Sequence, residues 1–271
     1  MRNINGEIRA TPEHFLNRGF LVGDALFETL KVIQRKILFF EDHYFRLMAS
    51  MRICRMEIPM SFTMEYLEEQ ILGLCDALAL ENARVRFTVY RNGAGFYAPE
   101  KNDIVFCITA QPGLPYVFSH QPFEADLFRD YFIPSHLLST IKTNNRMVNV
   151  VGSIFATENG LDTCLLLNDR KNVTEALNGN VFLVKNDVLK TPPLSEGCLN
   201  GIMRKQVLRW AATIGFKVEE APLSPFEIQD ADEMFITNVA VGIQPVTKYR
   251  KKEYGNAVSQ KFFEQLVSAA V

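Results

Sequence analysis

In the first half of the chain, the spacing of the apolar residues predicts both strands and helices. Short runs of apolar and β-branched residues, bounded by turn residues, favour strands. Longer segments with apolar positions three and four residues apart favour amphipathic helices, and Ser61 or Thr63 can cap the second of them. The pattern predicts strands at 27–33, 36–40, 83–90 and 104–110, and helices at 41–55 and 64–79.

Residues 111–123 interrupt this pattern, because they contain three prolines, a glycine and little periodicity. Such a composition is typical of a connection between domains. After it, the spacing predicts helices at 141–158, 201–214 and 259–270, and strands at 163–168, 181–185 and 234–236. The chain is therefore expected to be an α+β protein in two unequal parts. The predicted parts are a small domain at 1–112, a linker at 113–125 and a larger domain at 126–271.

The composition narrows the class of protein. With 271 residues, 48% of them hydrophobic and 22% charged, the chain is expected to be globular and not disordered. Its net charge of −2 argues against a general nucleic-acid coat or a polybasic membrane binder. No apolar stretch approaches the roughly 18–20 residues of a membrane helix, and no secretory signal is visible. Five cysteines and four histidines without ligand spacing favour reduced thiols, a cytoplasmic location and no metal site.

Common motifs for nucleotide binding and acyl transfer are missing from the sequence, which has no Gly-x-Gly-x-x-Gly, Walker loop or Gly-x-Ser-x-Gly. Four other segments are more informative. They are GFLVGDALFET at 19–29, followed by His43-x-x-Arg46-Leu47; STIKTNNRM at 139–147; NVTEALNGNVF at 172–182; and LNGIMR at 199–204, followed by DEMFITNVA at 232–240.

The residue types, order and spacing of these segments resemble those of the class IV aminotransferase family over nearly the whole chain. The resemblance implies an enzyme that uses pyridoxal 5′-phosphate (PLP) and has the fold-type IV architecture. That architecture pairs a small α+β domain with a larger pseudo-barrel domain. The resemblance also implies a homodimer.

Lys142 and Glu175 are the two residues to which the resemblance gives the central roles. Judged by position alone, each would be expected in solvent. In the resembling family the lysine that matches Lys142 forms the Schiff base with PLP, which requires an amine that is neutral part of the time. Burial and a neighbouring cation would lower its pKa. The carboxylate that matches Glu175 faces the pyridine nitrogen, where it favours the protonated ring that accepts electrons.

A phosphate cup is implied by a further group of positions. Arginine suits a phosphate because its planar donors bind two oxygens at once. Backbone N–H groups at a helix N-terminus form a natural anion site. The positions implied by the resemblance are Arg46, Leu199, Gly201, Ile202, Asn238 and Val239. Since a hydroxyl residue often stands where this chain has Val239, a shift of one or two positions would put Thr237 in the cup instead.

The substrate would contact Phe27, Thr29, Arg91, Asn145 and Arg146. The pattern Lys142-x-x-Asn145-Arg146 is similar to that of the 4-amino-4-deoxychorismate lyases of the family, which release pyruvate and leave 4-aminobenzoate for folate synthesis. Phe27 stands where aminotransferases of the family commonly have a tyrosine. If Lys142 begins a helix, the residues three and four places later flank the same pocket.

Met203 and Asn238 also resemble the lyase pattern more than the branched-chain aminotransferase pattern. Phe96, in contrast, replaces an arginine that D-amino-acid aminotransferases and many lyases have in this loop. The sequence therefore favours a lyase and leaves a branched-chain or D-amino-acid aminotransferase open. A PLP-binding protein without catalysis is a further alternative.

Overall fold

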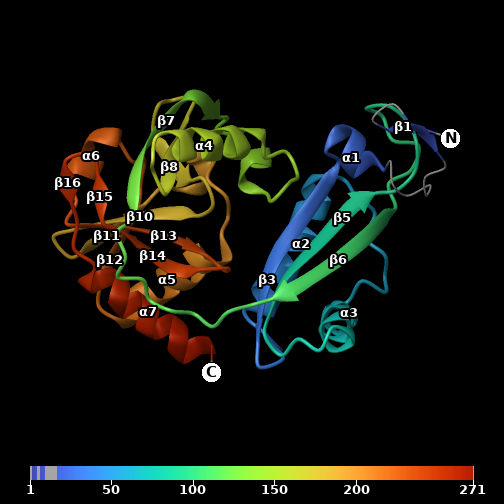
Figure 1. Ribbon diagram of the computed structural model, residues 1–271, viewed down its shortest axis with the longest axis horizontal. Coiled ribbons are helices and arrows are strands. Elements are labelled where there is room, and N and C mark those ends of the chain that lie inside the picture. The colour runs from blue at the N-terminus through green and yellow to red at the C-terminus, as the bar shows by residue number, and fades with distance from the viewer. Residues whose placement is uncertain (1, 5–6, 10–16, 271) are drawn as a thin grey trace.

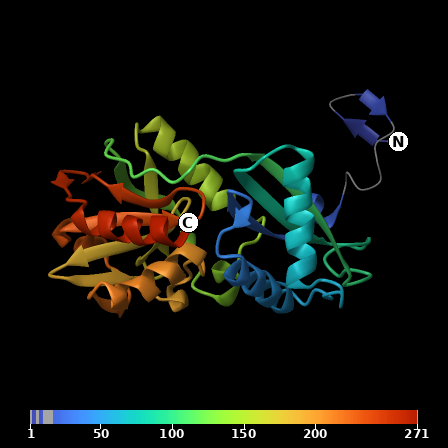
Figure 2. The same ribbon diagram turned by 90° about the horizontal axis from the view of Figure 1, so that it is seen from below.

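The computed structural model describes residues 2–4, 7–9 and 17–270, which form two lobes that lie side by side in both views of Figures 1 and 2. The small lobe contains a four-stranded antiparallel sheet in the order β4-β3-β5-β6, with helices on one face. Its elements are β1 (Arg2–Ile4), β2 (Glu7–Arg9), α1 (Arg18–Val22), β3 (Ala25–Ile33), β4 (Lys36–Ile37), α2 (Phe40–Ile53), α3 (Met64–Ala77), β5 (Ala83–Arg91) and β6 (Ile104–Pro112).

The two faces of this sheet have different uses, because successive side chains on a strand point to opposite sides. Leu26, Leu30 and Val32 of β3 are buried in a core with apolar residues of α2 and α3. The alternate positions, from Phe27 to Lys31, face the large lobe. Strands β3 and β4 are joined by a tight turn at residues 34–35. Both residues have positive φ, as two-residue hairpin turns commonly require.

The large lobe is built on two five-stranded sheets, in the orders β12-β11-β10-β13-β14 and β16-β15-β7-β8-β9. Their inner faces pack together over a core that includes Leu165, Val181 and Ile236. The elements are β7 (Glu124–Ile133), η2 (Leu137–Thr140), α4 (Met147–Glu158), β8 (Thr163–Asn168), β9 (Val173–Ala176), β10 (Asn180–Lys185), β11 (Val188–Thr191), η3 (Leu194–Glu196), α5 (Ile202–Thr213), β12 (Lys217–Glu220), α6 (Pro225–Asp230), β13 (Glu233–Asn238), β14 (Gly242–Val246), β15 (Lys248–Tyr249), β16 (Lys252–Glu253) and α7 (Ala257–Ala270). The α+β class with a curled, barrel-like second part is confirmed.

Residues 113–123 have neither helix nor strand and cross between β6 and β7 (green in Figure 1). This segment lies where the prolines predict a linker. We propose that the two lobes are the domains expected from the sequence, at 1–112 and 126–271. No helix within residues 17–270 is long and apolar enough to cross a membrane, and all five cysteines are free thiols.

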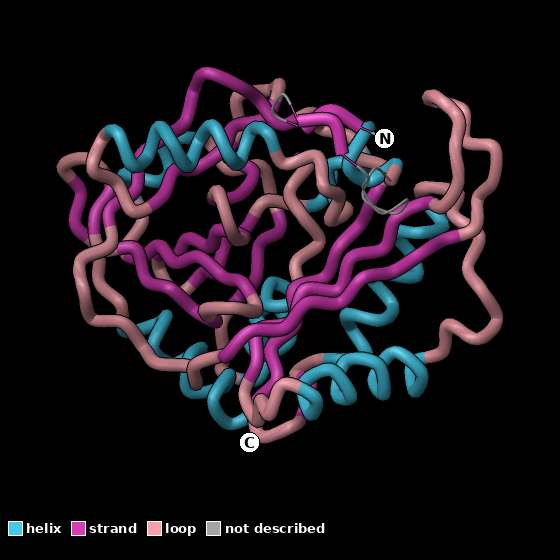
Figure 3. Tube along the Cα trace, turned by 45° about the vertical axis from the view of Figure 1, so that its right-hand side comes forward, coloured by secondary structure: helices cyan, strands magenta, loops and turns pink. Residues whose placement is uncertain are grey.

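The helix predicted at 141–158 is wrong over its first six residues, because α4 begins only at Met147. Residues 142–144 instead pair with the open edge of β3, where Leu26 and Thr143 form an antiparallel bridge. Ile141 is buried in the core of the small lobe. Figure 3 shows the small-lobe sheet as a diagonal magenta band beside the large-lobe strands.

Candidate functional site

A cavity of about 510 Å³ lies between the lobes and brings together most of the residues predicted for the site. The predicted residues that line it are Phe27, Thr29, Arg46, Lys142, Arg146, Glu175, Leu199, Gly201, Ile202, Asn238 and Val239. They come from β3, α2, the segment before α4, β9, the turn before α5 and the turn between β13 and β14. Residues far apart in sequence thus meet where the two lobes face each other.

Lys142 is held in the cavity by main-chain hydrogen bonds to β3. Phe27 N–H donates to the carbonyl oxygen of Lys142 at 2.9 Å, and Asn144 N–H donates to that of Ala25 at 2.9 Å. The Nζ atom of Lys142 lies 4.5 Å from the centre of the Phe27 ring. The lysine therefore depends on an extended backbone at this point, and a helix would have pointed it elsewhere.

The pKa of Lys142 is lowered to about 8, chiefly by burial and in addition by the positive charges of Arg46 and Arg146, while Glu28 and Glu175 oppose the shift. An amine with this pKa is neutral in roughly a tenth of molecules at pH 7, against well under a hundredth for an ordinary lysine. Lys142 is thus prepared to act as a nucleophile or as a base.

Glu175 lies on β9, and its side chain is buried. Its Oε2 atom accepts a hydrogen bond from Leu199 N–H at 2.7 Å. Burial raises the pKa of Glu175, whereas the Arg146 charge, the Leu199 N–H group and the Lys142 charge oppose that rise. A cationic N–H group beside this carboxylate would stabilise its ionised form.

Arg46 is part of a buried network that the sequence did not reveal. Its Nε atom donates to Glu28 Oε1 at 2.8 Å, its second terminal nitrogen bonds Glu28 Oε2, and Nη1 donates to the carbonyl oxygen of Asn200 at 2.8 Å. His43 Nδ1 lies 2.8 Å from Glu28 Oε2. Although burial opposes it, the pKa of Glu28 falls to about 2 because of Arg46 and His43. The sequence feature that could have indicated this network is Glu28, an acidic residue within the apolar run 25–30.

Two main-chain turns in the cavity wall have the properties of an anion site. Helix α5 begins after Gly201, which provides no side-chain cap, so the first N–H groups of the helix remain open. A Cβ at residue 201 would lie 1.9 Å from Asn180 Oδ1, so any other residue there would displace the Asn180 side chain. The second turn, at 239–241, joins β13 to β14. Both are suited to a phosphate group.

Thr237 and Val239 both line this part of the cavity. The hydroxyl oxygen of Thr237 is buried and has no hydrogen-bond partner within the described part of the chain. A buried, unsatisfied hydroxyl is costly unless a ligand completes its bonding. This orphaned hydroxyl, the open N–H groups, the low-pKa amine and the buried carboxylate together fit PLP.

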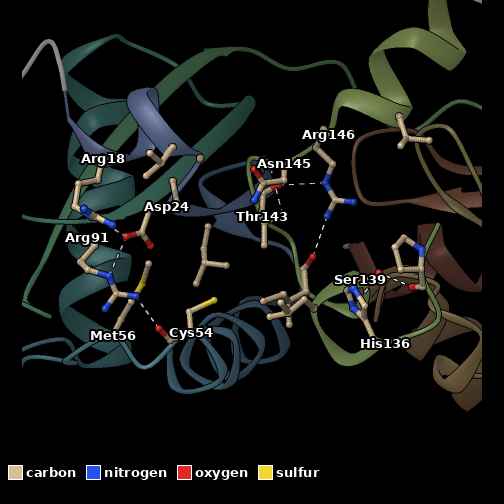
Figure 4. Close-up of a pocket in the computed structure, with 18 of the residues that line it drawn as sticks. Arg18, Asp24, Cys54, Met56, Arg91, His136, Ser139, Thr143, Asn145 and Arg146 are labelled. Atoms are coloured by element: carbon tan, nitrogen blue, oxygen red, sulfur yellow. Dashed lines mark hydrogen bonds and ion pairs between the residues drawn. The ribbon is translucent and has the colours of Figure 1, made fainter. Parts of the chain in front are cut away.

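Arg91 and Asn145 do not line this cavity. They line a second one of about 540 Å³, shown in Figure 4, and only Arg146, Asn149 and Glu175 are common to the two. The guanidinium of Arg91 bonds Asp24, Asn102 and the carbonyl oxygens of Cys54 and Arg55. All of these partners belong to the small lobe, so the Arg91 side chain stabilises that lobe.

Arg146 lies in the wall between the two cavities. It donates to the carbonyl oxygens of Thr143 at 3.2 Å and Ile141 at 3.0 Å, as the dashed lines in Figure 4 show. The expectation that Asn145 and Arg146 flank Lys142 on a helix is wrong, since 142–146 are not helical. Arg146 reaches the cavity of Lys142 by folding back over its own loop.

Arg84 and Arg86 line the cavity and were missed by the sequence interpretation. Both lie on β5, on the face opposite the buried Val85 and Phe87. The guanidinium carbon of Arg86 lies 3.7 Å from the centre of the Phe27 ring, and Nη2 donates to Asn144 Oδ1 at 3.0 Å. Neither arginine forms an ion pair with an acid among residues 17–270. The alternation of arginine and apolar residues at 83–87 is the sequence feature that could have indicated these two cavity residues.

Comparisons with known proteins identify the family of the chain. The profile of the family described as Amino-transferase class IV matches residues 25–249. A protein of Methanocaldococcus jannaschii assigned as a branched-chain-amino-acid aminotransferase is 32% identical over 235 residues, which are 85% of this chain and 80% of that protein. The D-alanine aminotransferase of Bacillus licheniformis is 27% identical over 245 residues, 89% of this chain and 84% of that one.

A solved structure from Legionella pneumophila, assigned as a 4-amino-4-deoxychorismate lyase, superposes with a TM-score of 0.87. It is 23% identical and covers 98% of both chains. At that identity the likeness establishes the fold.

The pKa of Lys142 sets a first prediction. We expect the rate at which the apoprotein captures PLP covalently to rise with pH, to reach half of its maximum near pH 8 and to level off roughly one to two pH units higher, because the neutral amine is the attacking form. The rate is measured by stopped-flow absorbance, with borohydride reduction to count adducts. Lys142→Ala should form no adduct, and Lys190→Ala, a lysine on β11, should behave as the wild type. A rate that continues to rise beyond pH 10 would contradict the prediction.

The Arg46–Glu28 pair sets a second prediction. Arg46→Met leaves a buried carboxylate without its cation, so we expect the apoprotein to lose about 3–5 kcal/mol of unfolding free energy at pH 7. The double variant Arg46→Met, Glu28→Gln should recover most of it. Urea unfolding measures these values. Arg35→Met breaks an exposed pair with Asp76 and should cost less than about 1 kcal/mol. If Arg46→Met lowered the unfolding free energy by an equally small amount, Arg46 would not be the cation that stabilises the buried Glu28 carboxylate.

Proposed function

Because the chain belongs to the class IV aminotransferase family, whose enzymes depend on PLP, we propose that it is a 4-amino-4-deoxychorismate lyase. This reaction removes pyruvate from aminodeoxychorismate and leaves 4-aminobenzoate. Such a role would place the protein in folate biosynthesis. The observation that carries the proposal is the pair Arg84 and Arg86, which face the cavity with no acidic partner among the described residues.

Cofactor binding is assigned to the residues gathered around the two turns. Arg46, Thr237 and the main chain at Gly201, Ile202 and Asn238 to Val239 would hold the phosphate. Three of the five N–H donors of Arg46 are used by Glu28 and Asn200, which leaves two for a ligand. Leu199 supports Glu175 from the main chain, and Glu175 would accept a hydrogen bond from the pyridine nitrogen. When bound, PLP supplies an acceptor for the electron pair left by proton removal.

Lys142 then acts as the base. Its Nζ atom takes the proton from the amine-bearing carbon of the substrate, for which its lowered pKa and its position beside Phe27 are suited. In the lyase reaction the bond between the neighbouring carbon and the ether oxygen breaks. The leaving enolpyruvate accepts a proton and becomes pyruvate, and the ring becomes aromatic. Thr29, on the same face of β3 as Phe27, lines the substrate side.

Substrate charge is the reason to favour elimination. Aminodeoxychorismate carries two carboxylates, both away from its amine, and Arg84 and Arg86 offer two guanidinium groups. Arginine binds carboxylates in a bidentate manner and remains charged. Arg146 adds a further guanidinium group to the same cavity. An apolar amino acid has a single carboxylate, next to its amine, and would leave at least one of these two arginines without an anion.

Amino transfer is the second candidate, and the 32% identical relative favours it. An amino acid with an acidic side chain, such as glutamate, would also place a carboxylate near Arg86. A PLP-binding protein without catalytic activity is the third alternative. The presence of both Lys142 and Glu175 in one cavity argues against it.

A product assay tests the proposal. We expect the holoenzyme to form pyruvate and 4-aminobenzoate in equal amounts from aminodeoxychorismate, faster than it transfers nitrogen from any L- or D-amino acid to a 2-oxo acid. Arg86→Met and Arg84→Met should each raise KM by about 10-fold or more, since a charged hydrogen bond is lost. Arg129→Met, an exposed arginine of β7, is the control. Rapid amino transfer without aminobenzoate would overturn the lyase assignment.

We also propose that the protein is a homodimer. Apolar side chains that are more than half exposed gather at η2 and along one side of α4, and we call them the α4 patch: Leu137, Leu138, Met147, Val150 and Ile154. Met147, Val150 and Ile154 follow helical spacing, so they form one stripe. Exposed apolar side chains that line one side of a helix are typical of an interaction site.

Light scattering after size exclusion measures the assembly. We expect twice the chain mass of 30.9 kDa for the wild type and a single chain for Val150→Glu, because a charge would be buried in the interface. Met60→Glu, an exposed apolar residue outside the α4 patch, should leave the dimer intact. A monomeric wild type at micromolar concentration would refute the proposal.

A further inference from the structure

Helix α2 of the small lobe and helix α5 of the large lobe are tied together by an acid near the start of α2. Asp42 Oδ1 pairs with Lys205 Nζ, and Asp42 Oδ2 accepts a hydrogen bond from Gln206 Nε2 at 2.6 Å. Arg209, which lies further along α5, has its Nη1 atom 3.2 Å from the same Asp42 oxygen. The side chain of Asp42 is only 12% exposed, so its partners in the other lobe largely replace solvent.

Asp42 is ionised at neutral pH. Burial works against ionisation, but the hydrogen bonds from Lys205 and Gln206 and the charges of Lys205 and Arg209 hold the pKa of Asp42 below its usual range. Its negative charge is therefore matched by cations of the other lobe.

Two further contacts join the same pair of helices, one on each side of this tie. The ring of Phe39, just before α2, packs against that of Trp210 of α5, with 6.3 Å between the ring centres. Arg46 Nη1 donates to the carbonyl oxygen of Asn200, just before α5, at 2.8 Å. Successive positions of α2 thus meet successively earlier positions of α5. The two helices run antiparallel and are joined at three levels.

The Asp42 tie lies one helical turn from the residues proposed to hold the cofactor phosphate. Asp42 and Arg46 are four residues apart on α2, so they lie on the same side of the helix and about 6 Å apart along its axis. On α5, Gln206 lies four residues after Ile202, whose N–H is one of the open donors at the start of that helix. A phosphate bound by Arg46 and by these N–H groups would bridge the two helices beside the tie.

We propose that Asp42 is a positioning residue, which keeps Arg46 on α2 and the open N–H groups of α5 at the separation at which both donate to one phosphate. A ligand that joins two lobes binds best when the lobes are already held in place, because less conformational freedom is lost on binding. Asp42 does not line the cavity, so it acts through α5 and not by contact with the ligand. This inference rests on the phosphate placement proposed above, and it is independent of the choice between elimination and amino transfer.

The test compares two ligands that differ only in the phosphate. Pyridoxamine 5′-phosphate and pyridoxamine lack the aldehyde, so neither bonds covalently to Lys142. Calorimetric titration of the full chain freed of cofactor gives both dissociation constants. We expect Asp42→Ala to weaken the phosphorylated ligand about 10-fold, as for the loss of a charged hydrogen bond, and pyridoxamine less than about 2-fold. The direction is diagnostic, because removal of a negative charge near a phosphate would by itself tighten binding.

A matched control and a second variant separate positioning from general effects of charge. Glu41→Ala removes the other acid in the first turn of α2, which is exposed and forms no ion pair within residues 17–270, and it should bind both ligands as the wild type does. Gln206→Met breaks the tie from the α5 side, so it should also weaken the phosphorylated ligand, and it tests the tie even if Asp42→Ala does not fold. Because both changes act on one tie, the double variant should lose less than the product of the two separate effects. Effects that multiply in full would contradict a shared tie.

Trp210 reports the contact between the helices without any ligand, because it is the only tryptophan of the chain and packs against Phe39. If the loss of Asp42 loosens α2 from α5, acrylamide should quench the fluorescence of the cofactor-free Asp42→Ala variant more strongly than that of the wild type. Glu41→Ala should be quenched as the wild type is. Unchanged quenching in Asp42→Ala would overturn the inference, because the helices would then keep their places without the tie.

Arg46→Met is titrated in parallel to distinguish two failures. If it weakens the phosphorylated ligand while Asp42→Ala and Gln206→Met do not, the inference is wrong and the phosphate placement stands. If none of the three has an effect, both are wrong. Equal loss for pyridoxamine and its phosphate would also overturn the inference, because it indicates general disruption of the site.

Discussion

The antiparallel pairing between the open edge of β3 and the segment around Lys142 is the interaction on which the site depends. Strand β4 covers only Val32 and Ile33 of that edge, which leaves the main chain at 25–27 free to pair with 142–144. The same strand sends alternate side chains into the core of the small lobe and into the cavity. One strand thus fixes the lysine, the aromatic ring beside it and the boundary between the lobes.

Charge is arranged around this pairing so that the two buried carboxylates, Glu28 and Glu175, each have cationic neighbours. Glu28, from the core side of β3, is ionised against Arg46 and His43. Glu175 is balanced by Arg146 and Lys142 and by the Leu199 N–H. The cavity still has more cations than anions, which is what an anionic cofactor and an anionic substrate require. Burial is the main cause of the neutral fraction of Lys142, and the neighbouring arginines increase it.

The sequence predicted the α+β class from local periodicity, which located α2, α3, β5 and β8 closely. The resemblance of its motifs to those of the family, and not any local signal, led to Lys142, Glu175 and Gly201, which line the cavity. The misplaced start of α4 has a physical cause. Residues 141–146 satisfy their main chain by pairing with a strand more than 100 residues earlier, and no local pattern contains that information. Arg84 and Arg86 were missed for a related reason, because their role depends on which face of β5 meets the large lobe.

The measurement closest to the central claim is the location of the covalent attachment. The holoprotein is reduced with borohydride, digested with trypsin and mapped by mass spectrometry. If the β3 edge presents Lys142 to the cofactor, one label per chain should appear on the peptide 130–146, uncut at Lys142. A label on Lys31, the other buried lysine of the lobe interface, or labels spread over several surface lysines, would contradict the account.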